Sequence, residues 1–491
     1  MHIRSQLPTV LVACCLTTVP AFAQDSDRSN EDIADLSLEE SMNINIEVTS
    51  VSKKSENLAT TNAAIHVITS EDIRRSGALS IPEALRMAPG LQVARLSSSA
   101  YAISSRGFNG EFEDKMLALI DGRTVDTPLF SGVFWNIQDL PLDDIAQIEV
   151  IRGPGGALWG ANAVNGVINL ITKSAEETQG SSLTAIVGAE EHGSLMFRHG
   201  GKLSDSGHYR ACAKYFDRDK LDNPGTGPAD DGNMSRAGFR TDWTSDEGDS
   251  STVQGDTYRS NEHGIMLEGT FIPDMGSGFD TFVALFGSED FESEEVLACE
   301  LSYRIQPSES LSLNFPAFIN DHENLVTQEF GAITPIGAGT LLQPVCFDNK
   351  FSGHTYGVET AGQWVVPENL QVHAGYAYIE MDLEVDSDSN DIVTGPHDVT
   401  LRHQAHMHSD YDLSETIEFD GSVCYVDDLS IYADSYVRGD VHLGWRPNAD
   451  TRISLAYQGL LHDEEEEFGD GPFGASYYVE SSVYVMATWS F

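Results

Sequence analysis

Apolar and polar residues alternate along the chain from about residue 180 to its C-terminus. A period of two places successive side chains on opposite faces of a β-strand. One face of the last strand carries Val483, Val485, Ala487, Trp489 and Phe491, and the opposite face carries Ser482, Tyr484, Met486, Thr488 and Ser490. Apolar side chains facing lipid and smaller or polar ones facing a lumen are typical of an outer-membrane strand.

Two β architectures produce this alternation. A soluble β-sandwich also buries every second residue, so the pattern alone does not separate it from a membrane barrel. The aromatic C-terminus, the long acidic loops and the export signal at the N-terminus favour the barrel. No run of about 18 apolar residues is present, so a membrane-spanning chain of this composition is expected to cross as a closed barrel.

Residues 57–175 have a different, mixed pattern, which predicts a small α+β domain. A helix is expected to start at Ser70 and stop at Gly77. Ser80, with Glu83 three residues later, has the spacing of a capping box for a second helix. The predicted strands of this domain are 65–69, 116–120, 148–151 and 167–171.

The N-terminus has the features of a secretory signal. His2 and Arg4 precede a short apolar stretch, and Ala21-Phe22-Ala23 supplies a cleavage site, so residues 1–23 are interpreted as a signal peptide. A lipoprotein cleavage site at Cys14 is the alternative interpretation. Residues 24–56 are polar and acidic without an apolar period, and we expect a mobile segment there.

The charge of the chain is strongly negative. It has 491 residues with 28 Lys and Arg against 77 Asp and Glu, which gives a formal net charge of −49. Such a surface repels nucleic acid, and plain solubility in salt is its simplest explanation. Cleavage of the signal would leave Cys212, Cys299, Cys346 and Cys424, which allow three different pairings.

A longer motif gives the domain a family resemblance. It runs from Ile148 to Lys173 and includes Arg152-Gly153-Pro154, Leu158-Trp159-Gly160 and Gly166-Val167-Ile168-Asn169. Supporting stretches are Ser105-Arg106-Gly107-Phe108 and Leu119 to Arg123. In order and spacing, residues 46–175 resemble the plug domain of TonB-dependent outer-membrane receptors. The C-terminal part resembles their barrels more loosely.

The resemblance implies two binding regions. Ile46–Ser52 resembles the Ton box, and its residues Glu47, Val48, Thr49, Ser50 and Val51 are expected to pair edge-on with the periplasmic TonB protein. The ligand would be a scarce small molecule such as an iron-siderophore complex or cobalamin. Exposed rings on the outer loops of the plug are the candidate ligand contacts: Tyr101, Phe130, Phe134 and Trp135.

Arg106 and Arg152 are candidate contacts between plug and barrel. A guanidinium group can form bidentate pairs with carboxylates of the barrel wall, which would hold the plug through a wet, breakable interface. The alternative is that both arginines serve the fold of the plug itself.

The length of the chain departs from the family pattern. A plug of such a receptor sits in a barrel of about 22 strands, whereas residues 180–491 supply only roughly 14–16 by the 9–11 residues that each strand needs. The family pattern breaks near residues 260–283, which favours an internal deletion there. A barrel of sixteen strands is about 32 Å across and the plug about 36 Å, so we expect either an open barrel or a closed one with the plug outside.

Other clusters carry weaker hypotheses. His403, His406 and His408 could approach a metal, whereas the acidic runs 382–391 and 464–467 are interpreted as solvated loops. No nucleophile–base pair, phosphate loop or CxxC is present, so neither an enzyme nor a bound cofactor is expected.

The sequence therefore predicts a shortened antiparallel membrane β-barrel with an N-terminal plug: 1–23 signal peptide, 24–56 mobile segment with Ton box, 57–175 plug and 180–491 barrel. The expected function is TonB-dependent uptake by a monomer in the outer-membrane lipid. The alternative is an internally deleted, non-transporting remnant that acts at most as a surface binding protein.

Overall fold

A computed structural model gives the fold of residues 47–491. Its gaps are residues 52, 54–55, 59–62, 111–112, 128–129, 161, 222–229, 245–249, 263–270, 273–279, 287–294, 309, 338–339, 367–368, 391–399, 430–432, 463 and 469–476. The predicted signal peptide and most of the predicted mobile segment, residues 24–46, lie outside the described residues.

In the described residues the plug consists of short strands, three short α-helices and one 3-10 helix, in agreement with the predicted α+β class. Its elements are β1 (Glu47–Val48), β2 (Glu56–Asn57), β3 (Ala64–Thr69), α2 (Ser70–Ser76), α3 (Ile81–Leu85), β4 (Leu91–Arg95), β5 (Tyr101–Ser105), β6 (Met116–Ile120), β7 (Arg123–Thr124), the 3-10 helix η3 (Leu142–Asp144), β8 (Ile145–Arg152), α4 (Gly156–Trp159) and β9 (Gly166–Thr172).

The wall follows as one long series of strands. Its elements are β10 (Gly180–Gly188), β11 (Glu191–Ser204), β12 (Gly207–Arg218), β13 (Gly232–Thr244), β14 (Ser250–Glu262), β15 (Phe271–Ile272), β16 (Asp280–Phe286), β17 (Glu295–Ser308), β18 (Leu311–Phe330), β19 (Thr334–Gly337), β20 (Thr340–Val366), β21 (Leu370–Val385), β22 (His403–Ser414), β23 (Ile417–Val426), β24 (Tyr436–Asn448), β25 (Thr451–Gln458) and β28 (Ser482–Ser490), with the loop strands β26 (Glu464–Glu465) and β27 (Val479–Glu480) before β28.

The plug is organised around a five-stranded sheet in the order β3-β8-β9-β6-β7. Its two faces carry separate apolar clusters, and Ile148, Ile168 and Leu170 in the larger cluster are almost completely buried. Helix α2 starts at Ser70, as expected, and its capping box is formed by Thr69 and Asp72. The sequence pattern also missed the hairpin of β4 and β5, whose residues are all buried and therefore do not alternate.

The wall has seventeen strands in the described part of the chain, and its last strand, β28, pairs with both β25 and the first strand, β10. The expected number was roughly 14–16. The difference comes from β15, β16 and β19, which are only two, seven and four residues long. One ladder also departs from the expected antiparallel order, because β16 runs parallel to β20.

The two ends of the wall differ. Tight turns join β11 to β12, β17 to β18, β22 to β23 and β24 to β25 at the end that also holds Phe491, which we call the turn end. The long connections 219–231, 386–402 and 459–481 lie at the opposite end, which we call the loop end. In outer-membrane barrels short turns face the periplasm and longer loops face outside.

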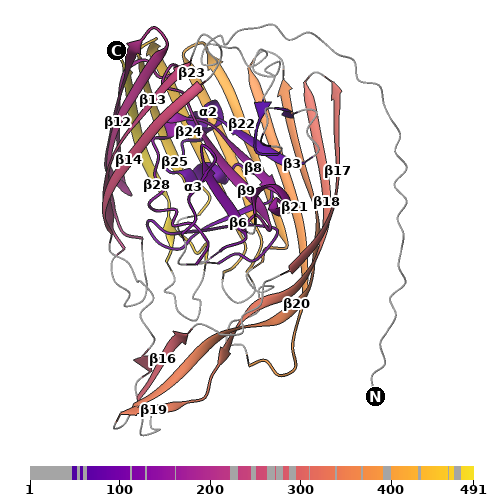
Figure 1. Ribbon diagram of the computed structural model, residues 1–491. Helices are drawn as coiled ribbons and strands as arrows, with labels where there is room; N and C mark the ends of the chain where they lie inside the picture. Colours follow the sequence, from indigo (N-terminus) through magenta and orange to yellow (C-terminus); the bar gives the residue numbers. More distant parts are fainter. Residues whose placement is uncertain are drawn as a thin grey trace. The chain divides into compact units, whose positions relative to one another are not determined.

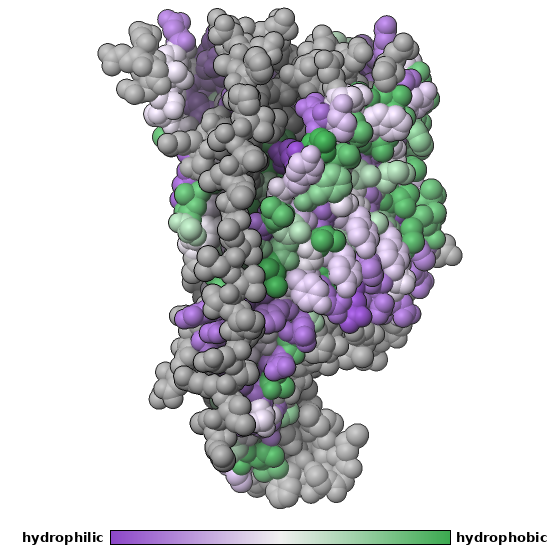
Figure 2. Space-filling view, turned by 90° about the vertical axis from the view of Figure 1, so that its right-hand side faces the viewer, coloured by the Kyte–Doolittle hydropathy of each residue, from purple (hydrophilic) through white to green (hydrophobic). Residues whose placement is uncertain are grey.

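The outer face of the wall is apolar. The alternation predicted for the last strand is present, since Val483, Val485 and Trp489 are exposed and Ser482 and Tyr484 are buried. Figure 2 shows another side of the wall, where apolar side chains are mixed with hydrophilic ones. Exposed apolar residues in such a band are the expected surface toward lipid.

The plug lies within the wall (Figure 1), which overturns the expectation of a closed barrel with the plug outside. Strand β16 pairs with Thr340–Cys346 of β20, whereas the plug contacts β20 at Glu359. These sites are separated by about 50 Å of extended chain. The other fourteen strands stand around the plug, and the wall is not the regular cylinder that the expected diameter assumes.

The wall is thinnest where the internal deletion was expected. Strands β14 and β17 do not pair with each other. The described strands between them along the chain, β15 and β16, are only two and seven residues long. The described side chains of β14 and β17 are exposed or half-buried on both faces of each strand. Both strands still reach the plug, through Gln254 to Asp121 and through Glu300 to Arg106.

Two smaller expectations concern helices and cysteines. Every helix in the described ranges is too short and too polar to cross a membrane. Cys212, Cys299, Cys346 and Cys424 are all free thiols, so none of the three pairings is formed.

We predict that β14 and β17 exchange their amide hydrogens faster than the rest of the wall. Strand β22 pairs along its length with both neighbours, whereas β14 and β17 each have one full-length neighbour. Local opening is easier where fewer ladder bonds hold a strand. Hydrogen–deuterium exchange in detergent micelles measures this difference, and equal protection of β14, β17 and β22 would contradict it.

Candidate functional site

Charged groups rather than apolar ones hold the plug against the wall. Arg75 on α2 lies against Asp410, Asp412 and Asp420 of the wall at 3.3, 2.8 and 2.6 Å. Its neighbour Arg74 pairs with Glu418 at 2.7 Å. Such pairs have definite geometry, but water can replace them if the two surfaces separate, unlike an interlocked apolar core.

The two arginines singled out in the sequence meet the same wall carboxylate. Arg106 Nε lies 3.2 Å from Glu359 Oε1, and Arg152 Nη1 lies 2.5 Å from Glu359 Oε2. Arg106 Nη2 also lies 2.9 Å from Glu300 Oε2, and its guanidinium stacks 4.1 Å from the ring of Phe318. The side chain of Glu359 is fully buried, as is that of Arg106. These contacts favour the plug–wall role over a role confined to the plug.

Residues 47–50 are bound to the plug, which corrects the expectation that the whole segment up to residue 56 is mobile. Val48 and Ser50 are buried, and β1 pairs with β2. The Glu149 carboxylate accepts hydrogen bonds from Thr49 N at 3.0 Å and from Ser50 N at 2.8 Å. Trp159 Nε1 donates to Ser50 O at 2.7 Å. The polar composition of residues 24–56 gave no sign of these contacts, because backbone groups of Thr49 and Ser50 make most of them.

A pocket opens at the loop end between plug and wall. It has about 570 Å³ of empty space, including its open mouth. The plug contributes Ser80 and Glu83 at α3 and Arg95 and Tyr101 at the hairpin of β4 and β5. Wall strands and the connection 459–481 contribute Glu190, Glu191, Arg218, Arg438, Glu465 and Glu480.

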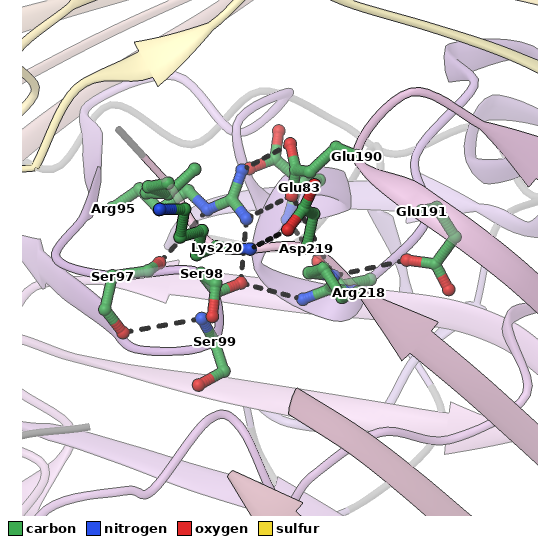
Figure 3. A network of polar contacts seen from close by, with 12 residues as sticks. Glu83, Arg95, Ser97, Ser98, Ser99, Glu190, Glu191, Arg218, Asp219 and Lys220 are labelled. Carbon is green, nitrogen blue, oxygen red and sulfur yellow. Dashed lines mark hydrogen bonds and ion pairs between the residues drawn. The ribbon is translucent and has the colours of Figure 1, made fainter. Parts of the chain in front are cut away.

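Ion pairs order the plug side of this pocket, as Figure 3 shows. Arg95 donates to Glu190 Oε2 at 3.0 Å and to the carbonyl of Ser98 at 2.7 Å. Arg218 donates to the same carbonyl at 3.0 Å and to Glu191 at 3.2 Å. The turn after β4 is therefore fixed by two arginines, one from the plug and one from the wall.

A second group of charges lies beside the pocket and includes two of its lining residues, Glu83 and Arg438. Glu83 accepts from Arg438 at 3.0 Å and from Arg86 at 3.0 Å. Glu467 accepts from Arg438 at 3.2 Å, from Arg86 at 2.7 Å and from the Arg95 amide at 2.8 Å. Burial alone would raise the pKa of Glu83, but the nearby guanidinium groups of Arg86, Arg438 and Arg95 hold it well below its usual range.

Glu465 stands apart from these pairs. It lines the pocket and is 6% exposed, yet among the described residues neither of its carboxylate oxygens has a hydrogen-bond partner. Burial and the neighbouring Glu467 carboxylate raise the pKa of Glu465 to about 7. The run 464–467 was expected to be a solvated loop. That is wrong for Glu465 and Glu467, because the connection folds back over the plug.

The four predicted ring residues lie in different surroundings. Tyr101 lines the pocket, and Trp135 belongs to the main core of the plug; they are only 7% and 8% exposed. Phe130 and Phe134 contact each other edge to face with centroids 5.0 Å apart, and neither lines the pocket. The premise that all four rings are exposed is therefore wrong, since the fold uses two of them as core.

The predicted histidine cluster is divided between the faces of β22. His408 is buried and bonds Asp410 at 2.8 Å. His403 bonds Tyr376, which is exposed, at 2.8 Å. A different group, Asp72, His373 and Asp410, brings three potential ligand atoms within 4.8 Å of one another. Of the acidic run 382–391, Asp391 lies outside the described residues.

Sequence reasoning missed the residues that build the pocket. Glu83, Arg95, Glu190, Arg218 and Arg438 come from distant parts of the chain. Glu83 was recognised as part of a capping box alone, and the other four belong to no recognisable motif. Their one shared signal is position, because the wall residues lie at the loop ends of strands.

We predict that Glu359→Ala destabilises the protein by about 3–5 kcal/mol, the usual cost of removing one partner from a buried ion pair. Arg106 and Arg152 would keep their charges in a buried site without this carboxylate. Thermal or denaturant unfolding in micelles measures the change, with Glu415→Ala as an exposed control. Equal stability of the two variants would show that Glu359 is dispensable.

We predict that Glu149→Ala releases residues 47–50 from the plug. Two backbone donors would lose their buried acceptor. A spin label at exposed Glu47 should change from a restricted to a mobile spectrum, while Glu177→Ala, at an exposed position, leaves it unchanged. A restricted label in the Glu149 variant would mean that the pairing of β1 with β2 holds the segment.

Comparison with known proteins identifies the architecture. The family profile for the TonB-dependent receptor plug domain matches residues 57–167. The profile for the TonB-dependent receptor-like β-barrel matches residues 236–458. The two matches fall on the plug and on the wall as the structure divides them.

Curated relatives match the chain in part. The vitamin B12 transporter BtuB of Vibrio vulnificus strain CMCP6 is 30% identical over 174 residues, which are 35% of this chain and 28% of that protein. BtuB of Vibrio cholerae O1 strain O395 is 29% identical over 199 residues, which are 40% of this chain and 31% of that protein. The matched region thus spans less than a third of these relatives.

Solved structures share the fold. A single-residue mutant of the ferric enterobactin receptor PfeA of Pseudomonas aeruginosa superposes with a TM-score of 0.63 at 13% identity, over 88% of this chain and 99% of that one. The siderophore receptor PirA of Acinetobacter baumannii gives 0.61 at 12% identity, over 93% and 100%. With a plug inside a β-barrel wall and a family profile matching each, the chain belongs to the TonB-dependent receptor family, whose members are outer-membrane β-barrels.

Proposed function

We propose that this protein is a receptor for energised uptake of a scarce ligand such as an iron-siderophore complex or cobalamin across the outer membrane. The observation that carries the proposal is a plug held inside the wall by ion pairs, with an N-terminal segment attached through few contacts. A plug that can be moved without unfolding the wall suits gated transport.

The proposed partner at the turn end is the periplasmic TonB protein, which would bind residues Glu47 to Val51. Edge-on strand pairing requires free backbone N–H and C=O groups. In the structure Thr49 N and Ser50 N are occupied by Glu149. TonB therefore has to bind after these two bonds open, which makes Glu149 the group that controls exposure of the segment.

The proposed ligand-binding site is the pocket at the loop end. Tyr101 is the predicted ring residue that reaches it, and Trp135 would support it from the core. Phe130 and Phe134 would contact ligand only outside this pocket. The relatives named as vitamin B12 transporters and the structures titled as siderophore receptors support the choice of ligand classes.

The remaining parts of the proposal concern the setting of the protein. We propose a monomer whose apolar outer face contacts outer-membrane lipid. The signal peptide 1–23 directs its export and is then cleaved. The acidic balance argues against a nucleic-acid partner, and transport of this kind needs neither an enzyme activity nor a bound cofactor.

Transport by a short wall is the point to test. Uptake of radiolabelled cobalamin and of ferric siderophores is measured in a Gram-negative strain lacking its own receptors, with and without TonB. The proposal expects uptake of at least one ligand only when TonB is present. Surface binding without uptake would instead support the non-transporting remnant.

We predict that Thr49→Pro abolishes uptake and leaves surface binding of the same ligand intact. Proline removes the Thr49 donor, which serves both the contact with Glu149 and a new strand pairing. Thr49→Lys keeps the backbone N–H and is the matched control, with uptake near the wild-type rate. Wild-type uptake by the proline variant would place the TonB contact elsewhere.

A further inference from the structure

The loop-end pocket has an excess of negative charge. Five carboxylates and three guanidinium groups line it. The arginines are already paired, Arg95 with Glu190, Arg218 with Glu191 and Arg438 with Glu83. The two remaining carboxylates, Glu465 and Glu480, are therefore not neutralised by the pocket's own arginines.

Glu465 is the more informative of the two, because it is buried. A buried carboxylate without a partner costs free energy unless something supplies a donor. Its neighbour Glu467 shows the usual solution, since Arg86, Arg438 and the Arg95 amide all donate to it. Glu465 lies on the same connection and lines the pocket, and neither of its oxygens has a hydrogen-bond partner among the described residues.

The geometry favours an organic cation over a bare metal ion. Metal sites need several ligand atoms close together. In the described residues the one group of three such atoms within 4.8 Å is Asp72, His373 and Asp410, none of which lines this pocket. An ammonium or guanidinium group needs only one carboxylate and a few additional acceptors.

We propose that the loop-end pocket binds a positively charged organic group of the ligand, an ammonium or a guanidinium, with Glu465 as its counter-charge. This deepens the proposed function, on which it rests for the idea that the pocket faces arriving ligand. The ring of Tyr101 lines the same pocket and supplies an apolar surface beside the charge. A strongly anionic complex would meet unpaired carboxylates there and bind poorly.

Two probes that differ only in one charge test the proposal. The ferric complex of desferrioxamine B carries a free primary ammonium group, and its N-acetylated form is neutral and otherwise alike. Binding of each to the purified protein in micelles is measured by isothermal titration calorimetry. Wild-type protein should bind the ammonium probe about tenfold more tightly, the factor that ~1.4 kcal/mol supplies.

The variants show whether Glu465 is the cause. Glu465→Gln should bind both probes alike. Glu464→Gln removes the same charge from the adjacent, exposed residue of β26 and should keep the wild-type preference. Equal binding of both probes by wild type, a preference kept in Glu465→Gln, or no binding of either probe would each overturn the proposal.

The affinity for the ammonium probe should also rise with pH. The charges that face Glu465 are Glu467 on its own connection, Arg438 and Asp440 of β24, and Arg86 of the plug. Because burial and Glu467 raise its pKa to about 7, Glu465 becomes fully charged only above neutral pH. We expect about a tenfold gain from pH 6 to pH 8 in wild type and none in Glu465→Gln. A flat profile in wild type would contradict the role of Glu465.

These measurements separate the pocket from transport. The binding assay uses purified protein without TonB. Charge-selective binding combined with absent uptake would refute the proposed function and keep the pocket assignment, whereas TonB-dependent uptake without charge selectivity would do the reverse.

Discussion

The structure depends on one buried carboxylate of the wall. Glu359 of β20 lies between two arginines of the plug. Arg106 directly follows β5, and Arg152 is the last residue of β8. Both arginines are in the buried centre of the molecule, where an unpaired charge is costly. The position of the plug is therefore fixed electrostatically, and the other ion pairs, such as Arg75 with Asp420, orient the remaining faces.

An interface of this kind combines precision with reversibility. Each pair has a defined geometry, yet water can solvate both partners if the plug moves, so the wall does not lose an apolar core. The same chemistry recurs on a smaller scale where Glu149 holds Thr49 and Ser50. A single acceptor that binds two backbone donors keeps a strand-forming segment from pairing with a partner until those bonds open.

The short wall is compatible with this arrangement because the plug contacts both of its weakest strands. Glu300 of β17 pairs with Arg106, and Gln254 of β14 bonds Asp121. The plug thus contacts two strands that each have a full-length paired neighbour on one side alone in the described part of the chain. Plug and wall depend on each other more than in a complete barrel, whose strands form a continuous ladder.

The sequence by itself determined the two-part architecture, because period-two alternation and the Ile148–Lys173 motif are local patterns that survive without three-dimensional information. It also indicated Arg106 and Arg152, since each lies beside a glycine in a recognisable stretch. Only the tertiary structure decided that Thr49 is held by Glu149, that Trp135 is core and that Glu465 is a buried, unpaired acid in a pocket. These properties arise between residues far apart along the chain, and burial and charge pairing depend on neighbours that no local pattern specifies.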